Sequence, residues 1–315
     1  MVTELGSTGL VVSRIGLGLA ALGRPGYINI GHGRDLAGAT DERSMERSAH
    51  AVLDDAYARG VRYFDAARSY GKAEAFLASW LHERGLGRDE VTVGSKWGYT
   101  YTAGWRVDAD EHEVKELSVE NLRRQSRESL DLLGSNLRVY QIHSATIESG
   151  VLEDSAVREE LALLRSRGIF VGLSVTGPRQ SQTIESALDV GGFDTVQATW
   201  NLLDQSAGEA LAAAHSAGLG VIVKEALANG RLTDRGAIPE LMDAARQANT
   251  TPDALAIAAV LAQPWAGVVL SGATTSAQLE SNLAALALEP EPQLLDGLRE
   301  DPERYWETRA ALPWN

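Results

Sequence analysis

The sequence predicts a single (β/α)₈ barrel of the α/β class. Short runs of aliphatic and β-branched residues alternate with longer stretches of helical periodicity, which is the pattern of βα units on a parallel sheet. Eight such pairs follow one another, and this regular succession favours a closed barrel over an open sheet. At 315 residues the chain has an ordinary length for one barrel. We therefore expect residues 1–315 to form one domain.

The elements are predicted in order from an N-terminal β-hairpin, in which residues 2–5 and 10–13 flank a turn with glycine at both ends. Eight strands are expected at 15–19, 61–65, 91–96, 137–142, 169–174, 195–198, 220–224 and 268–271. Helices are expected near 43–59, 72–84, 118–133, 151–167, 180–189, 205–217, 252–262 and 276–286. Several of these helices are introduced by Asp or Ser, which are favoured N-cap residues.

Four segments lie outside the eight predicted βα pairs. They span about 22–42, 97–117, 228–250 and 288–315. The first three follow strands 1, 3 and 7. In a barrel they would lie at the C-terminal mouth, where the active sites of this fold are found. We expect these extra loops, and a C-terminal helix or tail, to surround a site at that mouth.

The composition and net charge of the chain argue against several classes of function. The net charge of −14 makes attraction to a phosphate backbone unfavourable, so no nucleic-acid partner is expected. The chain has no cysteine, which excludes disulfides and thiolate chemistry. The N-terminus lacks a basic region followed by an apolar stretch, and no later run is long enough to suggest a span. A soluble cytoplasmic protein without membrane contact is expected.

Four polar residues stand at or just beyond the ends of predicted strands: Asp65, Tyr70, Lys96 and His143. In a barrel their side chains would converge at one mouth. A Tyr hydroxyl has an ordinary pKa of about 10 and needs a nearby cation to exchange protons near neutral pH. Lys96 could be that cation and Asp65 its counter-ion. Each residue alone has an ordinary explanation as a cap, a solvated charge or a packing residue; the set predicts proton transfer to a carbonyl oxygen.

The segments around these residues resemble the successive signature blocks of the aldo-keto reductase superfamily. They read GVRYFDAARSYGKAE, VGSKWG, VYQIHS, VGLSV, VQATWNLL, VKEALANGRL and LSGATTSAQLESNL. The resemblance implies an oxidoreductase that moves hydride between a nicotinamide cofactor and a carbonyl carbon. It implies Tyr70 as general acid or base, Lys96 as the group that lowers its pKa, Asp65 as the support of Lys96, and His143 as the group that orients the carbonyl. No metal is implied.

The resemblance also implies a cofactor site, with two departures. Ser174 and Gln197 correspond to residues that hold the nicotinamide carboxamide, but Val175 replaces the family's Asn. Lys224 stands where the family usually stacks an aromatic residue on the nicotinamide. Three residues match the loop that passes over the pyrophosphate: Leu227, Ala228 and Gly230.

The last block resembles the loop and helix that hold the adenosine phosphate. Its matching residues are Ser271, Gly272, Thr274, Gln278 and Asn282. The block is a helix N-terminus, which favours anions, yet residues 271–282 contain no Lys or Arg. NADP(H) is the first expectation from the family, with NAD(H) as the alternative and a weak preference between them.

A substrate pocket is expected in the loop after Lys96, where Trp97, Tyr99 and Trp105 could form an aromatic wall for a sugar-like or ring-bearing carbonyl compound. The alternative is that these rings only pack the loop onto the barrel. The substrate, the reaction direction and the choice between monomer and homo-oligomer stay open. Two other functions also stay open: a nicotinamide-binding regulatory module like the potassium-channel β subunits, and a metal-dependent or lyase-type sugar enzyme on the same barrel.

Overall fold

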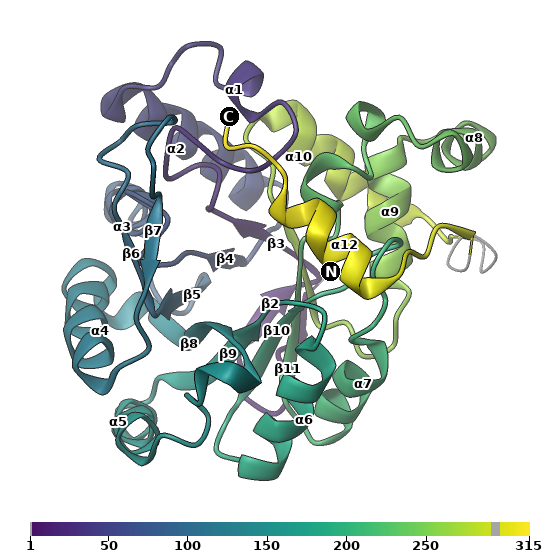
Figure 1. The fold of residues 1–315 in the computed structure, drawn as a ribbon. Helices are drawn as coiled ribbons and strands as arrows, with labels where there is room; N and C mark the ends of the chain where they lie inside the picture. Colours follow the sequence, from purple (N-terminus) through teal and green to yellow (C-terminus); the bar gives the residue numbers. More distant parts are fainter. Residues whose placement is uncertain (1, 291–296) are drawn as a thin grey trace.

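Eight parallel strands close into a barrel in the computed structural model, which describes residues 2–290 and 297–315. Their order around the barrel is β10-β11-β12-β3-β4-β5-β8-β9, and Figure 1 shows the helices arranged around them. The strands are β3 (Ile15–Gly18), β4 (Tyr63–Asp65), β5 (Thr92–Trp97), β8 (Leu137–Ala145), β9 (Phe170–Val175), β10 (Thr195–Thr199), β11 (Gly220–Lys224) and β12 (Val268–Ser271). The predicted fold class and all eight predicted strands are confirmed.

The eight predicted helices also form, with ends shifted by a few residues. They are α2 (Glu42–Ala58), α3 (Ala73–Arg84), α4 (Val119–Leu133), α5 (Ser155–Ser166), α6 (Gln180–Val190), α7 (Gly208–Ser216), α9 (Pro252–Leu261) and α10 (Ser276–Leu283). Side-chain caps fix several starts. Asp41 accepts from the Ser44 amide at 3.0 Å, and Ser118 accepts from the Asn121 amide at 3.2 Å. The apolar faces of these helices pack on the outside of the barrel in one continuous core.

The predicted N-terminal hairpin consists of β1 (Val2–Glu4) and β2 (Val11–Ser13). Its Leu5, Leu10 and Val12 are buried in a separate cluster with inward-facing residues of the barrel strands, among them Tyr63 and Ile222. This contact closes the N-terminal end of the barrel. The C-terminal end of the barrel therefore remains available for a functional site.

The extra segments form structure that was not predicted in detail. A second hairpin pairs β6 (Tyr99–Tyr101) with β7 (Glu113–Lys115). The short helix α1 (His32–Asp35) lies in the segment after β3, and α8 (Pro239–Gln247) lies in the segment after β11. Helix α12 (Pro302–Ala310) crosses the face of the barrel in Figure 1. The tail beyond it reaches the segment after β3, where Asn315 and Tyr27 exchange two backbone hydrogen bonds of 3.2 and 3.0 Å.

Within the described part of the chain, no helix is both long enough and apolar enough to cross a membrane.

Candidate active site

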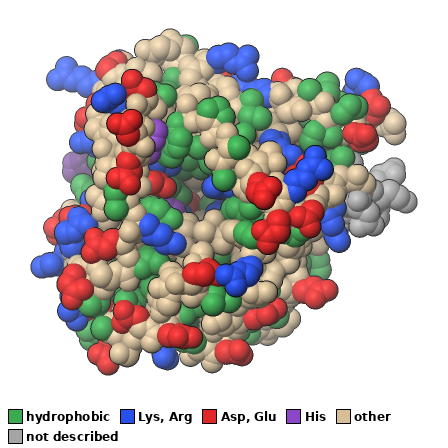
Figure 2. Space-filling model, viewed as in Figure 1, with side chains coloured by type: hydrophobic (Ala, Val, Ile, Leu, Met, Phe, Trp, Pro, Cys, Tyr) green, Lys and Arg blue, Asp and Glu red, His purple; other side chains and the backbone are tan. Residues whose placement is uncertain are grey.

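A cavity of about 710 Å³ opens at the C-terminal mouth of the barrel. Figure 2 shows it as a hollow near the centre of this face, with charged and hydrophobic side chains around it. Its lining comes from the ends of the strands, from the segments after β3 and β11, and from α12 with its tail. The volume falls within the range of about 300–1,000 Å³ that is usual for small-molecule and cofactor sites.

Asp65, which lines this cavity, forms a buried ion pair with Lys96. Asp65 ends β4, Lys96 lies on the neighbouring strand β5, and their side chains are 2% and 1% exposed respectively. Lys96 Nζ donates to Asp65 Oδ1 and also to the backbone oxygen of Ala66 at 3.0 Å. The predicted pairing of this lysine with this aspartate is present.

The second carboxylate oxygen of Asp65 accepts from two side chains of the barrel interior. Gln197 Nε2 on β10 donates to Asp65 Oδ2 at 3.0 Å, and the hydroxyl of Tyr63 donates to the same oxygen at 3.4 Å. Gln197 Nε2 also lies 3.3 Å from Gln141 Oε1. Buried polar groups need such partners, so this network holds the Asp65 carboxyl group in place. Gln197 was predicted only as a cofactor contact. Its contact with Asp65 joins two residues that are 132 positions apart, so no local sequence pattern indicated it.

Tyr70 lies on the turn after β4, and the turn is held against the segment after β3. Gly23 accepts from the Lys72 amide at 2.7 Å, and a Cβ on Gly23 would lie 2.2 Å from the Tyr70 carbonyl oxygen. Only glycine allows this approach. The Tyr70 ring lies 5.1 Å from Lys96 Nζ and 5.5 Å, edge to face, from the His143 ring.

The pKa of Tyr70 is raised above its ordinary value, first by burial and then by the negative charge of Asp65, while Arg24 opposes the shift. Tyr70 is therefore a neutral phenol at neutral pH, which can donate a proton. In the ligand-free protein the expected lowering of this pKa by Lys96 is outweighed by burial and by the negative charge of Asp65.

His143 lies within β8, where its ring is buried between the rings of Tyr70 and Tyr99; the latter is 4.9 Å away. Burial lowers the pKa of His143 well below its ordinary value, and the charges of Lys96 and Arg24 lower it further. The imidazole is therefore neutral at neutral pH. The next residue, Ser144, has a φ of 56°, and its amide donates to Ser174 Oγ at 2.8 Å. This bond fixes the turn that presents His143.

Arg24, which no sequence pattern singled out, lines the cavity and is 2% exposed. Its Nη1 donates to Glu113 Oε2 at 2.9 Å and to the Ser69 carbonyl at 3.0 Å. Its guanidinium lies 5.3 Å from the Tyr70 ring and 4.8 Å from the Trp314 ring. Arg24 is thus a second fixed cation beside the candidate proton donor.

Lys224, which stands where the family resemblance implied an aromatic residue, and the following Glu225 both line the cavity. Lys224 Nζ donates to Thr199 Oγ1 at 2.7 Å and lies 5.6 Å from the Trp306 ring. Arg309 of α12 donates to both carboxylate oxygens of Glu225, with Nε–O distances of 2.9 and 3.0 Å. Burial lowers the pKa of Lys224 to about 8. Burial alone would raise the pKa of Glu225, but Arg309 and Lys224 outweigh it and lower this pKa to about 2.

The Glu225 ion pair leads to a stability prediction. The folded pKa of about 2 lies below the ordinary 4.5, so the pair stabilises the fold above pH 4.5 and loses this effect as pH falls toward 2. Replacing Glu225 by Gln is expected to lower the free energy of unfolding by about 2–3 kcal/mol at pH 7, with a smaller difference at low pH. Urea unfolding at pH 7 and pH 3 measures both values, and Glu307→Gln, an exposed residue of α12, is the control. An equal difference at both pH values would contradict this account.

The predicted residues of the cofactor's adenosine end gather at the start of α10. Ser271 Oγ donates to Asn282 Oδ1 at 2.7 Å, and Gln278 Oε1 accepts from the Thr274 amide at 2.9 Å. A Cβ on Gly272 would meet nothing closer than Asn29 Nδ2 at 3.9 Å, so the backbone there faces open space. All five residues line the same cavity as Tyr70 and His143. Leu227 and Gly230 line it as well.

Six of the predicted residues are not among the described residues that line the cavity: Lys96, Trp97, Tyr99, Trp105, Ser174 and Ala228. Trp97 follows Lys96 on the same strand, so its side chain points out of the barrel, where it is fully buried in the core. Trp105 packs edge-on against Phe76 and donates to the Thr40 carbonyl at 2.7 Å. The prediction that Trp97 and Trp105 form the pocket wall is corrected, because both rings serve packing. Tyr99 contributes only through its contact with His143, and Ser174 is also set back from the cavity.

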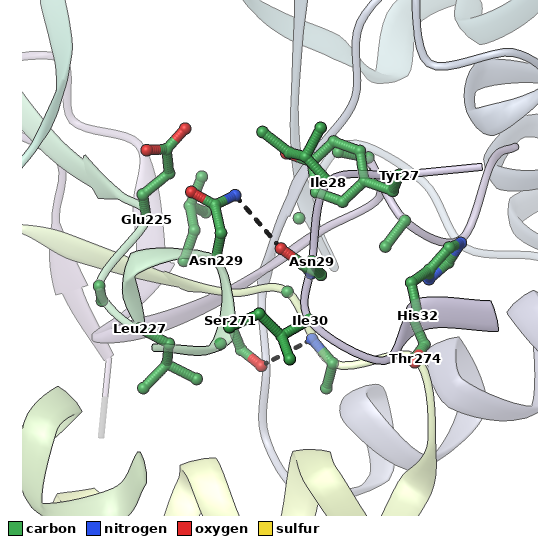
Figure 3. A pocket seen from close by; sticks show the side chains of 18 of the residues that line it. Tyr27, Ile28, Asn29, Ile30, His32, Glu225, Leu227, Asn229, Ser271 and Thr274 are labelled. Carbon is green, nitrogen blue, oxygen red and sulfur yellow. Dashed lines mark hydrogen bonds between the residues drawn. The ribbon is translucent and has the colours of Figure 1, made fainter. Parts of the chain in front are cut away.

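The cavity wall comes instead from the segment after β3 and from the C-terminal tail. The Tyr27 ring meets the Trp314 ring edge-on at 6.2 Å, and Trp314 stacks on His112 at 3.9 Å. In Figure 3, Tyr27 and Glu225 lie on opposite sides of the opening. Both segments were expected to surround the mouth, whereas the aromatic wall was predicted in the loop after Lys96.

Comparisons with known proteins agree with this geometry. A sequence model described as "Aldo/keto reductase family" matches residues 14–296. This chain belongs to the aldo/keto reductase family. L-galactose dehydrogenase of Arabidopsis thaliana is 28% identical over 329 residues, covering 98% of this chain and 93% of that protein. The NADH-specific methylglyoxal reductase of Escherichia coli (strain K12) is 27% identical over 319 residues, covering 90% of this chain and 92% of that protein.

The fold of this aldo-keto reductase is also shared by a solved structure. The holo form of aldo-keto reductase AKR11C1 from Bacillus halodurans superposes with a TM-score of 0.71 at 21% identity, covering 98% of this chain and 95% of that one. The family relationship identifies the chain as an oxidoreductase, and this structural likeness supports the barrel fold.

Proposed function

We propose that this aldo-keto reductase reduces an aldehyde or ketone to an alcohol with NAD(P)H, or catalyses the reverse, and that Tyr70 is its general acid or base. One observation carries the proposal. Tyr70, His143 and the Asp65–Lys96 ion pair meet at one end of a cavity that continues to the N-terminus of α10. A proton donor and an elongated site are thus placed together, as a dinucleotide-dependent carbonyl reductase requires.

The lining suits a nicotinamide dinucleotide. Within the described part of the chain, His143 Nδ1 and Asn229 Oδ1 are buried at this site and have no hydrogen-bond partner, which a bound ligand could supply. The first turn of α10 offers backbone amides to an anionic group. Gln197 and Ser271 would hold the cofactor through their polar ends. When bound, NAD(P)H supplies the hydride that the carbonyl carbon gains.

The side chains of this chain supply the proton and the electrostatics. Tyr70 Oη gives its proton to the carbonyl oxygen, so the carbonyl carbon gains hydride, the oxygen gains H⁺ and Tyr70 is left as a phenolate until solvent reprotonates it. Lys96 stabilises this phenolate, because its charge is fixed 5.1 Å from the ring. A neutral His143 donates a hydrogen bond that orients the carbonyl oxygen.

The substrate end of the cavity is polar and charged. Arg24, Glu113, Glu225 and Arg309 line it together with the aromatic rings of Tyr27 and Trp314. Carboxylates accept hydroxyl hydrogens and arginines donate, while an aromatic ring covers the apolar face of a sugar. We therefore propose a hydroxylated, sugar-like carbonyl compound as the substrate class.

This assignment predicts which tryptophan governs substrate choice. Replacing Trp314 by Ala is expected to lower kcat/KM for an aldose larger than three carbons by a factor equivalent to about 1–3 kcal/mol, because the ring that covers the substrate is removed. A small aldehyde such as methylglyoxal should lose much less. Replacing Trp105 by Ala is the control: it should lower the melting temperature and leave the ratio of the two kcat/KM values unchanged. The reverse pattern would place the pocket wall back in the loop after β5.

A panel of carbonyl compounds and alcohols, followed at the nicotinamide absorbance with both cofactors, tests the proposed function. Saturable turnover with a carbonyl compound supports it. Tight cofactor binding without turnover on any compound would favour a regulatory nicotinamide-binding module. Turnover of sugars without any nicotinamide binding would favour a lyase-type barrel enzyme.

A further inference from the structure

Two loops meet at the end of the cavity that lies beside α10. The Ile30 amide donates to the Asn229 carbonyl at 2.9 Å, and Asn229 Nδ2 donates to Asn29 Oδ1 at 3.3 Å, as Figure 3 shows. Arg235 Nη1 donates to the Ile30 carbonyl at 2.8 Å. The segment after β3 is thereby attached to the segment after β11 across the opening.

Asp35 ends α1 at this junction, with a side chain that is 13% exposed and lines the cavity. Arg235 Nη1 donates to Asp35 Oδ2 at 2.8 Å, and its Nη2 donates to Oδ1. Gln278 Nε2 of α10 donates to Asp35 Oδ2 at 2.9 Å. Burial acts to raise the pKa of Asp35, but the bonds from Arg235 and Gln278 outweigh it, so the group is a carboxylate at neutral pH.

Asp35 lies at the end of the cavity that would hold the adenosine half of a bound dinucleotide. The nicotinamide must lie beside Tyr70, because hydride transfer occurs there. The cavity runs from Tyr70 to the start of α10, so the adenosine half of an elongated dinucleotide has to lie at the α10 end. NADPH differs from NADH by one phosphate on the adenosine ribose, and a phosphate needs charge-assisted donors.

The cationic side chains that could donate to such a phosphate already have hydrogen-bond partners in this cavity. Among the described residues that line it, the Lys and Arg side chains are those of Arg24, Lys224, Arg235 and Arg309. Arg24, Lys224 and Arg309 lie near Tyr70 or Glu225, paired as described above. Arg235 is the cation beside α10, and both of its terminal nitrogens donate to Asp35. Gln278 donates to Asp35 and accepts from Thr274.

We propose that Asp35 makes this enzyme selective for NAD(H), by occupying Arg235 and Gln278 and by placing a carboxylate where the ribose phosphate of NADP(H) would lie. The proposal rests on the proposed function, since it concerns the same cofactor. It reverses the preference for NADP(H) that the family resemblance implied. Asp35 is a specificity-determining residue outside the proton-transfer set, so its replacement should change cofactor affinity rather than the chemical step.

The test measures dissociation constants for NADH and NADPH by quenching of protein fluorescence, in the full-length protein without substrate. The wild type should bind NADH more tightly than NADPH. Asp35→Asn should free Arg235 and improve NADPH affinity relative to NADH by at least about tenfold, the scale of one charge-assisted hydrogen bond. Asp35→Ser should act in the same direction, and Asp35→Asn combined with Arg235→Gln should lose the gain.

The matched control is Asp234→Asn, which removes an equal charge from an exposed residue that lines the same cavity next to Arg235. Its ratio of dissociation constants should stay within about twofold of the wild type. Melting temperatures of all variants identify any that fail to fold. A wild type that prefers NADPH, or a ratio unchanged in both Asp35 variants, would overturn the inference while leaving the proposed function intact. Binding of neither cofactor would overturn both.

Discussion

Replacing Tyr70 by Phe is expected to lower kcat by about 10²–10⁴-fold or more, because the variant lacks the hydroxyl that protonates the carbonyl oxygen. The ring should keep its packing against His143 and its place beside Lys96. Dissociation constants for NADH and NADPH should therefore change by less than about threefold, and the melting temperature should change little. Steady-state kinetics with a carbonyl substrate, together with cofactor fluorescence titrations, measure both quantities. A variant with near-normal kcat would show that another group is the acid.

The Asp65–Lys96 ion pair should show the largest effect on stability. Lys96→Met would leave Asp65 as an unpaired buried carboxylate, so the free energy of unfolding should fall by about 3–5 kcal/mol at pH 7. Activity should fall by at least about 100-fold, because the phenolate of Tyr70 loses its stabilising cation. Any residual activity should show an alkaline limb of the pH profile at a different pH from that of the wild type.

A double variant separates these two effects. Asp65→Asn combined with Lys96→Met removes both charges and should recover much of the stability lost in Lys96→Met, since replacing both members of a buried pair is far less costly than removing one. It should not recover activity. A double variant that regained turnover would assign the pair a purely structural role.

The barrel could be predicted from the sequence because each βα unit carries its own signal. β-branched runs with caps and helical periodicity recur along the chain, and the two strands β11 and β12 have the predicted limits. The convergence of Asp65, Tyr70, Lys96 and His143 was also predictable, because residues at the C-terminal ends of barrel strands converge whatever the details of packing. The position of Trp97 could have been predicted as well: strand residues alternate, so a neighbour of the inward-facing Lys96 points outward.

The sequence patterns that predict structure were weaker in the loops than in the βα units. Helix α8 begins with Pro239 and Glu240, a pattern typical of a helix start that could have found it. The hairpin of β6 and β7 spans a long loop and had no such marker. The ion pairs that shape the cavity are long-range: Arg24 and Glu113 are 89 residues apart, and Glu225 and Arg309 are 84 apart. Their pairing depends on how the loops fold over the mouth, which no local pattern determines.

The measurement that tests the central claim most directly is the transfer of label from cofactor to product. The enzyme is mixed with reduced cofactor deuterated at C4 of the nicotinamide, in separate reactions for NADH and NADPH and for each C4 face, with a carbonyl compound that the panel identifies as a substrate. NMR of the alcohol product should show deuterium on the carbinol carbon from one of the two faces, and the signal should disappear with Tyr70→Phe over the same time. An alcohol without deuterium from any labelled cofactor, or label transfer that is unchanged in Tyr70→Phe, would contradict the account.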